Sequence, residues 1–261
     1  MKILVCVKQV PNTTEITIDP ITNTLNRDGV PSIINPDDRA AIEVALSLKD
    51  QTGASVVLVS MGPPQAEVAL REGLAMGADQ AYLISDRAFA GSDTLATSTI
   101  IAKAIEKIGF DYIIAGRQAI DGDTAQVGPQ MAEHLNIPQI TYCADFSYDQ
   151  ANDKFRVKRQ FEDRYQWLEV SGKALFTVLG SAVKPRYMNV ADIIAQDDQT
   201  INLLTFADLD CPLERIGLAG SPTKVKTSFA KQFNNDKQLV ETTPEEAASI
   251  IIKQLSDKHL I

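Results

Sequence analysis

Continuous apolar runs alternate with amphipathic stretches through the first half of the chain. The runs cover residues 2–7, 55–60, 82–84 and 112–115. Runs of this kind are typical of strands buried in a parallel sheet, and the stretches between them are typical of helices. The alternation predicts an α/β fold built on a doubly wound, mostly parallel sheet.

The pattern changes after Pro138. Residues 139–145, 154–161, 165–170 and 174–179 have the composition of strands joined by polar turns. They predict a partly antiparallel extension of the sheet. A separate small hairpin is predicted for residues 15–18 and 24–26, which flank a turn-rich Asp19-Pro20.

The C-terminal part shows little periodicity before its last helix. Residues 195–241 have no clear element of their own, and such a long segment is uncommon in a compact domain, so we expect it to lie along a partner. Thr243, Pro244 and Glu246 form a capping box that starts a final amphipathic helix. We therefore expect an α/β domain in residues 1–194 and an extended C-terminal arm with a helix in residues 195–261.

Composition narrows the classes of function. The chain has 261 residues, 44% of them hydrophobic, and no apolar run is long enough to span a bilayer. Its formal net charge is −9, and no stretch gathers the basic residues, so neither nucleic acid nor a membrane is an expected partner. Three scattered cysteines and two histidines give no metal motif, and the absence of a signal sequence favours the cytoplasm.

Residues 116–129, which we call the signature loop, carry the most chemistry. The loop follows the apolar run 112–115 and precedes a predicted helix at 127–135. A buried strand that breaks at a glycine and restarts as a helix is where α/β sheets bind ligands. Three glycines allow close approach of a ligand, and the free N–H groups of the helix favour an anion. The loop predicts a phosphate-containing ligand, first of all a nucleotide; the alternative is an ordinary strand-to-helix turn.

Other polar positions follow the predicted strands. Because strand-end loops of a doubly wound sheet meet at one edge, we expect Lys8, Asn35 and Met61 to converge with the signature loop on one crevice. Thr94 and Thr97 begin a predicted helix, where they would hold a phosphate or ribose or, alternatively, only cap a solvated surface. Neither a GxGxxG nor a GxxxxGK[ST] motif occurs.

A group of basic residues lies within the predicted antiparallel extension. Arg156, Lys158, Arg159 and Arg164 are explained by a solvated strand face. Trp167, the single tryptophan, is explained by core or interface packing.

The signature loop resembles that of the beta subunits of electron-transfer flavoproteins. The resemblance covers nearly the whole chain, with short motifs in the family's order at residues 5–8, 35–36, 61–63, 73–79, 118–128 and 184–187. It implies a heterodimer with an alpha subunit that carries FAD. It also implies an adenine nucleotide in the beta-subunit crevice, which is AMP in one branch and a second FAD in the electron-bifurcating branch.

The resemblance implies roles for individual residues. Together with Lys8, Thr94 and Thr97, the expected nucleotide contacts are Cys6, Asn35, Asp37, Asp38, Met61, Gln118, Ala119, Asp121, Gly122, Asp123, Thr124, Gln126, Val127 and Gly128. Pro185, Arg186, Tyr187 and Val190 resemble the recognition loop that anchors a partner dehydrogenase, with Val190 where the family usually has leucine. No catalytic acid or base and no metal is expected, because the flavin carries the redox step.

Residues 123–129 and 86–98 favour the electron-bifurcating branch, because they resemble that form. AMP-binding relatives tend to have asparagine at the position of Ala125 and no proline at that of Pro129. We therefore favour FAD, reduced by NADH, with electrons divided between ferredoxin and an acyl-CoA or similar dehydrogenase. The chain is then one subunit of an NAD(H)-dependent flavin oxidoreductase complex.

Two alternatives stay open. One is an AMP-holding subunit of a simple electron carrier without NADH chemistry. The other is a nucleotide-sensing domain of the universal-stress-protein kind, against which the strands after residue 138 and the long tail argue.

Overall fold

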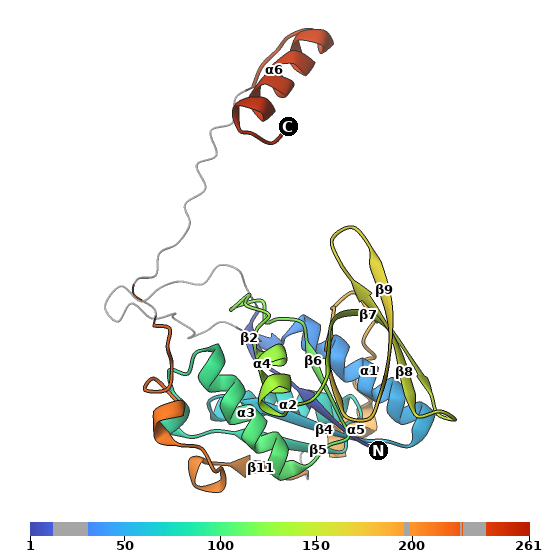
Figure 1. Cartoon of the computed structure of the whole chain (residues 1–261), viewed down its shortest axis with the longest axis vertical. Helices are drawn as coiled ribbons and strands as arrows, with labels where there is room; N and C mark the ends of the chain where they lie inside the picture. Colours follow the sequence, from blue (N-terminus) through green and yellow to red (C-terminus); the bar gives the residue numbers. More distant parts are fainter. Residues whose placement is uncertain (13–30, 196–198, 225, 227–238) are drawn as a thin grey trace. The chain divides into compact units, whose positions relative to one another are not determined.

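The computed structural model describes residues 1–12, 31–195, 199–224, 226 and 239–261. Contacts divide the chain into two compact units, Met1–Thr227 and Ser228–Ile261, each of which is described by itself (Figure 1). The predicted hairpin at residues 15–18 and 24–26 lies outside the described residues.

The first unit is built on a large sheet. In the described chain its strands are β1 (Lys2–Cys6), β4 (Ser55–Met61), β5 (Gln80–Ile84), β6 (Tyr112–Gly116), β7 (Gln139–Asp149), β8 (Lys154–Gln160), β9 (Tyr165–Ser171), β10 (Ala174–Val178) and β11 (Ile201–Leu204). Their spatial order is β11-β5-β4-β1-β6-β10-β7-β8-β9. The pairs from β11 to β7 are parallel, and the β7–β8 and β8–β9 pairs are antiparallel.

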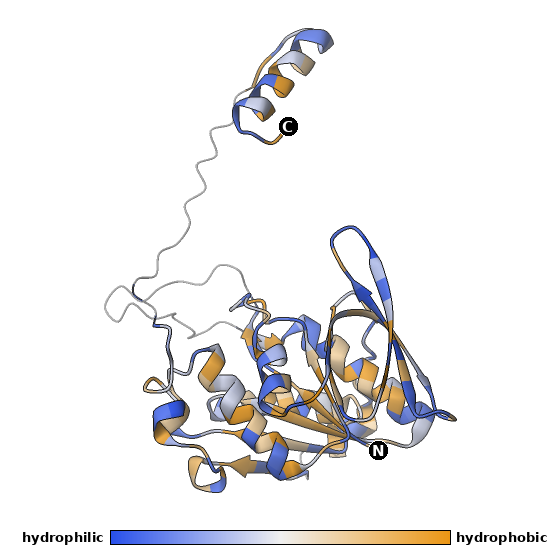
Figure 2. Cartoon of the chain, in the orientation of Figure 1, coloured by the Kyte–Doolittle hydropathy of each residue, from blue (hydrophilic) through white to orange (hydrophobic). Residues whose placement is uncertain are grey.

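Helices cover both faces of this sheet. They are α1 (Pro36–Thr52), α2 (Glu67–Ala75), α3 (Thr94–Ile108) and α4 (Val127–His134). The short helix α5 (Val190–Ala195) lies against α2 and buries no residue, and short 3-10 turns occur at Pro64–Ala66, Arg87–Phe89, Phe206–Asp208 and Leu213–Arg215. Apolar residues of α1 and α2 form one core with one face of the sheet, and those of α3 and α4 form a second core with the opposite face. The central strands β1, β4 and β6 are accordingly apolar along most of their length (Figure 2). The predicted doubly wound, mostly parallel α/β fold with an antiparallel extension is confirmed.

The sequence predicted no clear element in residues 195–241, but the structure contains strand β11 there. Its four residues pair in parallel with β5 at the edge of the sheet, and only Leu204 is buried. A strand this short, with one buried side chain, leaves no periodic signal in the sequence.

Trp167 lies outside the core of the sheet. It is 47% exposed, and the guanidinium of Arg156 stacks 4.6 Å from its ring centroid.

A pair of short strands and a C-terminal helix complete the described chain. Strands β2 (Gln9–Pro11) and β3 (Ser32–Ile34) form a separate antiparallel pair that leads into α1. In the second unit, α6 (Pro244–Asp257) begins at the predicted capping box of Thr243 and Glu246. Among the helices of the described residues, none combines the length and the apolar character needed to cross a membrane.

Candidate functional site: the crevice at the ends of β1 and β6

The strand order reverses at β1. The chain passes from β1 to β4 on one side and later returns through α3 to β6 on the other side. Crevices at such reversals, outside the carboxyl ends of the strands, are the usual ligand sites of α/β sheets. The signature loop follows β6 directly, so the fold brings it to the predicted edge.

Asn35 holds the first part of the signature loop. Its side chain is fully buried; Nδ2 donates to the backbone oxygen of Gln118 at 2.8 Å, and Oδ1 accepts from the backbone N–H of Ile120 at 3.1 Å. Its own backbone N–H donates to the oxygen of Lys8 at 2.9 Å. A buried amide that is matched to a backbone donor and acceptor in this way sets the path of the loop.

Three further contacts tether the rest of the loop. The ammonium of Lys8 lies 2.7 Å from Asp121 Oδ1, and the side chain of Gln118 donates to Asp123 within the loop. Thr94, in the first turn of α3, donates its hydroxyl to Gln126 Oε1 at 2.8 Å. The structure therefore brings Lys8 and Asn35 together with the signature loop, as the sequence predicted, and it adds Thr94. The loop residues in these contacts are Gln118, Asp121, Asp123 and Gln126.

The two aspartates at the start of α1 join strand ends. Asp38 is 7% exposed, and its carboxylate accepts from the backbone N–H groups of Lys8 at 2.8 Å and Gly116 at 3.1 Å. Asp37 accepts from Gly180 N–H at 2.9 Å and forms an ion pair with Arg117 at 3.2 Å. Because the protein itself supplies these hydrogen-bond and ion-pair partners, both carboxylates hold the strand ends in place. A direct contact of either carboxylate with a nucleotide stays a prediction.

Burial changes the titration of two groups at this edge. Burial raises the pKa of Asp38 to about 7, although hydrogen bonds from the Lys8 backbone, the Asn35 side chain and the Gly116 backbone oppose the shift. Burial, with a smaller contribution from Asp38, raises the pKa of the Cys6 thiol to about 12. Cys6 is therefore a neutral thiol at physiological pH, 4.0 Å from the sulfur of Met131.

The exposed part of the signature loop has an unusual backbone. Asp123 and Ala125 adopt φ angles of 51° and 53°, the left-handed region that non-glycine residues rarely occupy. Gly122, Asp123 and Thr124 are exposed, and an added Cβ at Gly122 would meet no atom within 4 Å. The loop thus offers backbone and hydroxyl groups to a ligand, and the sequence did not predict that Asp123 and Ala125 would carry the strain.

The two helix starts beside the loop differ in their free N–H groups. Asp93 caps α3 by accepting from the backbone N–H groups of Leu95 and Ala96 at 3.0 and 3.1 Å. At α4, no side chain of the described residues caps the first turn, which contains Val127 and Gly128. The favourable end of the α4 dipole is therefore available to an anion, whereas that of α3 is already neutralised.

The remaining predicted positions lie around this edge. Ala119 and Val127 are half-buried within the loop and at the start of α4, and Met61 is half-buried at the end of β4. Thr97 is half-buried in the first turns of α3. Ser60, next to Met61, was missed: its hydroxyl is buried and has no hydrogen-bond partner among the described residues.

The loop that contains Pro185 to Val190, here called the recognition loop, is fixed at its base and apolar at its tip. Arg186 donates to Glu43 through Nε and Nη2, both at 2.9 Å, and to Asp50 at 2.7 Å; these partners raise the pKa of the guanidinium. Tyr187 is 85% and Val190 71% exposed. Sequence reasoning missed Glu43 and Asp50, because nothing in a helical sequence marks acids that will pair with an arginine 143 and 136 residues away.

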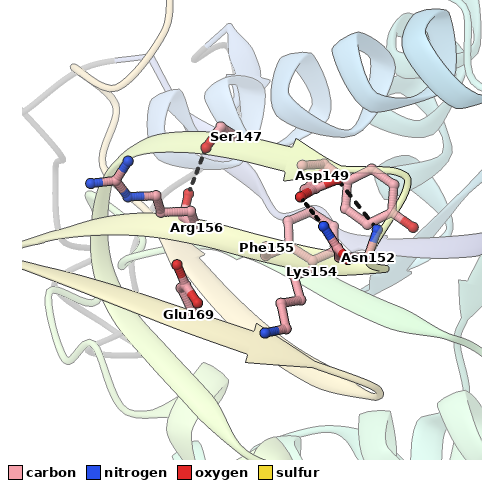
Figure 3. Close-up of a pocket in the computed structure, with 8 residues that line it drawn as sticks. Ser147, Asp149, Asn152, Lys154, Phe155, Arg156 and Glu169 are labelled. Carbon is pink, nitrogen blue, oxygen red and sulfur yellow. Dashed lines mark hydrogen bonds between the residues drawn. The ribbon is translucent and has the colours of Figure 1, made fainter.

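Two hollows formed by described residues lie away from the ends of β1 and β6. One, of about 500 Å³, lies under the recognition loop and is lined by residues that include Lys49, Asp79 and Arg186. The other, of about 430 Å³, lies on strands β7 to β9 between Ser147, Lys154 and Glu169 (Figure 3). Neither contains a residue predicted to bind the nucleotide. Within the described ranges, no group of three or more His, Cys, Asp or Glu side chains is placed to hold a metal ion.

Comparison with known proteins agrees with this architecture. The electron transfer flavoprotein domain model matches residues 22–209. The chain is 50% identical to the electron transfer flavoprotein subunit beta of Clostridium acetobutylicum over the full length of both chains. It is 47% identical to the caffeyl-CoA reductase-Etf complex subunit CarD of Acetobacterium woodii and 48% identical to the acryloyl-CoA reductase electron transfer subunit gamma of Anaerotignum propionicum, with full coverage in both cases. The chain therefore belongs to the electron transfer flavoprotein family and is a beta subunit of an electron-transfer complex.

Proposed function

We propose that the crevice at the ends of β1 and β6 holds FAD, and that this FAD takes electrons from NADH for flavin-based bifurcation. The observation that carries the proposal is the pairing of an uncapped α4 start with a signature loop whose exposed backbone is held in place by Asn35, Lys8 and Thr94. Diphosphate groups of dinucleotides favour such a helix start. The buried hydroxyl of Ser60, which has no hydrogen-bond partner among the described residues, would supply a further donor at the same sheet edge.

The residues of the chain act by position and electrostatics. Asn35 fixes the loop that would lie against the nucleotide, and Lys8 keeps a positive charge at the crevice mouth, where its side chain is 48% exposed. A bound flavin supplies the redox chemistry of the site. The nucleotide contacts at Cys6, Asp37, Asp38, Met61 and Thr97 are part of this proposal.

We also propose the partners. Relatives named for caffeyl-CoA and acryloyl-CoA reductases support an acyl-CoA or similar dehydrogenase as one electron acceptor. The recognition loop, with its exposed Tyr187 and Val190, would dock that dehydrogenase. A low-potential carrier such as ferredoxin would take the other electron. Free cysteines in the chain fit a location in the cytoplasm.

The C-terminal arm is proposed to pack on the alpha subunit. Helix α6 exposes Ile250, Ile251 and Ile252, and it has no buried residue. An amphipathic helix that buries no residue within the described part of its own unit gains most by covering apolar surface on another chain.

The test is the nucleotide content of the purified heterodimer, measured by chromatography after denaturation. We expect two FAD per heterodimer, and NADH should reduce the one in this subunit in stopped-flow absorbance. One FAD with one AMP would contradict the FAD assignment and place the chain with the simple carriers. Release of no nucleotide beyond the alpha-subunit FAD would contradict a nucleotide site altogether.

A pair of variants locates the second nucleotide. Asn35→Asp removes the donor to Gln118 and places two oxygens against each other, so the FAD content should fall below two per heterodimer. Asn202→Asp is the matched control, because Asn202 makes the same kind of contact, from Nδ2 to the backbone oxygen of Ala81 at 3.2 Å, on β11. The control should retain two FAD.

A further inference from the structure

Residues 217–223 are joined by hydrogen bonds to the loop that precedes α3. The backbone N–H of Gly217 donates to Ser92 Oγ at 3.1 Å, and the backbone N–H of Asp93 donates to Ser221 Oγ at 2.8 Å. Ser221 is 5% exposed, and it donates in turn to the backbone oxygen of Gly217 at 2.7 Å. These residues, here called the arm root, lie near the end of the first unit, and the second unit begins at Ser228.

The arm root packs closely against the loop before α3 at two glycines. Gly217 has a φ angle of 57°, and an added Cβ there would lie 2.3 Å from the backbone oxygen of Ala88. A Cβ at Gly91 would lie 3.2 Å from Leu218. The close approach of the two backbones shows that the arm root has one specific seat on the loop before α3.

Asp93 is the centre of this seat. One carboxylate oxygen caps α3 through the N–H groups of Leu95 and Ala96, and the other accepts from Thr223, at 3.0 Å from its backbone N–H and 2.7 Å from its hydroxyl. Burial alone would raise the pKa of Asp93, but these hydrogen bonds, first of all that of the Thr223 hydroxyl, outweigh it and lower the pKa. A single ionised side chain thus serves the helix start and the arm root.

The next residue reaches the nucleotide crevice. Thr94 donates to Gln126 Oε1 at 2.8 Å, and Gln126 immediately precedes the uncapped start of α4. The first turn of α3 therefore contacts the arm root through Asp93 and the signature loop through Thr94. Helices α3 and α4 also share one apolar core, so a displacement of the first is felt by the second.

We propose that Asp93 is a positioning residue that couples the seat of the C-terminal arm to the nucleotide crevice. When Thr223 leaves Asp93, the first turn of α3 loosens, Gln126 loses its anchor at Thr94, and the nucleotide is held less tightly. This coupling rests on the proposed function of the crevice.

The test compares Thr223→Val and Thr223→Ser in the purified heterodimer. Valine keeps the shape of the side chain and removes the hydroxyl, and Thr223 is exposed, so the core is unaffected. Hydrogen exchange of the Leu95 and Ala96 amides should become about tenfold faster in Thr223→Val, as expected for the loss of a hydrogen bond to a carboxylate. Release of the adenine nucleotide should become roughly three- to tenfold faster, and Thr223→Ser should restore both rates.

Thr52→Val is the matched control, because the Thr52 hydroxyl makes the same kind of intrahelical bond, to the Leu48 oxygen at 2.6 Å, on α1, which packs on the opposite face of the sheet from α3 and α4. It should release nucleotide at the wild-type rate. Wild-type nucleotide release in Thr223→Val, with or without faster amide exchange, would overturn the coupling and leave the proposed function intact. A wild-type heterodimer without a nucleotide in this subunit would overturn both.

Discussion

Two buried polar side chains, Asn35 and Asp38, hold the ends of β1 and β6 in a common frame. Asn35 satisfies a donor and an acceptor of the signature loop, and Asp38 accepts from the backbone of both strand ends. A buried polar side chain lowers the stability of the fold unless its hydrogen bonds are made. Replacing a single atom of either side chain should therefore destabilise the folded chain. The sequence marked both residues as nucleotide contacts, which stays a prediction, and it did not predict their role in this frame.

Asp38 predicts a specific pH dependence of stability. Its pKa rises from an ordinary 3.8 to about 7 on folding, so between these values the folded chain keeps a proton that the unfolded chain has lost. Its contribution to the free energy of unfolding is therefore complete below pH 4 and declines as the pH rises towards 7. Asp38→Asn, neutral at every pH, should lack this decline when urea unfolding is followed from pH 4.5 to 7.5.

The control for this prediction is Asp163→Asn, an exposed position on the β8–β9 turn. It should keep the wild-type slope of unfolding free energy against pH. An Asp38→Asn slope equal to that of the wild type would show that Asp38 titrates in the folded chain as it does in the unfolded one.

Among the elements, α4 lies very close to β10. An added Cβ at Gly128, in the first turn of α4, would lie 2.7 Å from the Cγ2 of Thr177 on β10. The sequence predicted this glycine as a ligand contact, whereas the structure shows that helix–strand packing already requires it. Both roles can hold, because close packing here is what brings the helix start to the crevice.

Substitution of the two glycines separates these roles. Gly128→Ala should lower the free energy of unfolding by about 1–3 kcal/mol, because the helix must move away from Thr177. Gly122→Ala, in the same loop, should unfold like the wild type, because its Cβ would meet no atom within 4 Å. Chemical denaturation of both variants is the measurement, and equal losses in the two would contradict the packing role of Gly128.

The recognition loop depends on a contact to α1. Arg186→Ala removes the bonds to Glu43 and Asp50, and the loop must then be ordered when the partner binds. Since that ordering costs binding free energy, we expect the affinity for the partner dehydrogenase to fall about tenfold. Calorimetric titration of the heterodimer with the dehydrogenase measures this, and the nucleotide content should stay unchanged.

A control for the loop is Lys49→Ala. Lys49 lines the same hollow, but its ammonium pairs with Asp79 and not with the loop. It should bind the dehydrogenase as the wild type does. If Arg186→Ala also bound normally, the loop would not need its base contact for docking.

For the molecule as a whole, the two compact units differ in what they bury. The first contains both cores of the sheet, whereas no residue of α6 in the second is buried. An apolar helix face left open by its own unit is the expected form of a surface made for another chain.

This difference predicts the effect of one charge on assembly. Ile251→Lys places an ammonium on the apolar face of α6 and should weaken the complex with the alpha subunit by about tenfold or more. Ser249→Lys, on the opposite side of the helix, should assemble normally. Analytical ultracentrifugation measures the fraction of heterodimer that each variant forms with the alpha subunit. Equal assembly of both variants would contradict packing of α6 on the alpha subunit.

Local sequence was enough to predict the alternating strands and helices, the signature loop after β6 and the start of α6 at its capping box. These features arise from neighbouring residues: apolar runs, glycine positions and a threonine three residues before a glutamate. The convergence of Lys8, Asn35 and the signature loop also followed, because parallel strands bring their carboxyl ends to one edge.

Other features required the folded chain. Asp93 meets Thr223 across 130 residues, and Arg186 meets Glu43 across 143, while β11 joins the sheet through four residues with one buried side chain. No local pattern marks such partners, because a hydrogen bond between distant residues is specified by the packing of whole elements. The anchored arm root and the anchored recognition loop are therefore properties of the tertiary structure.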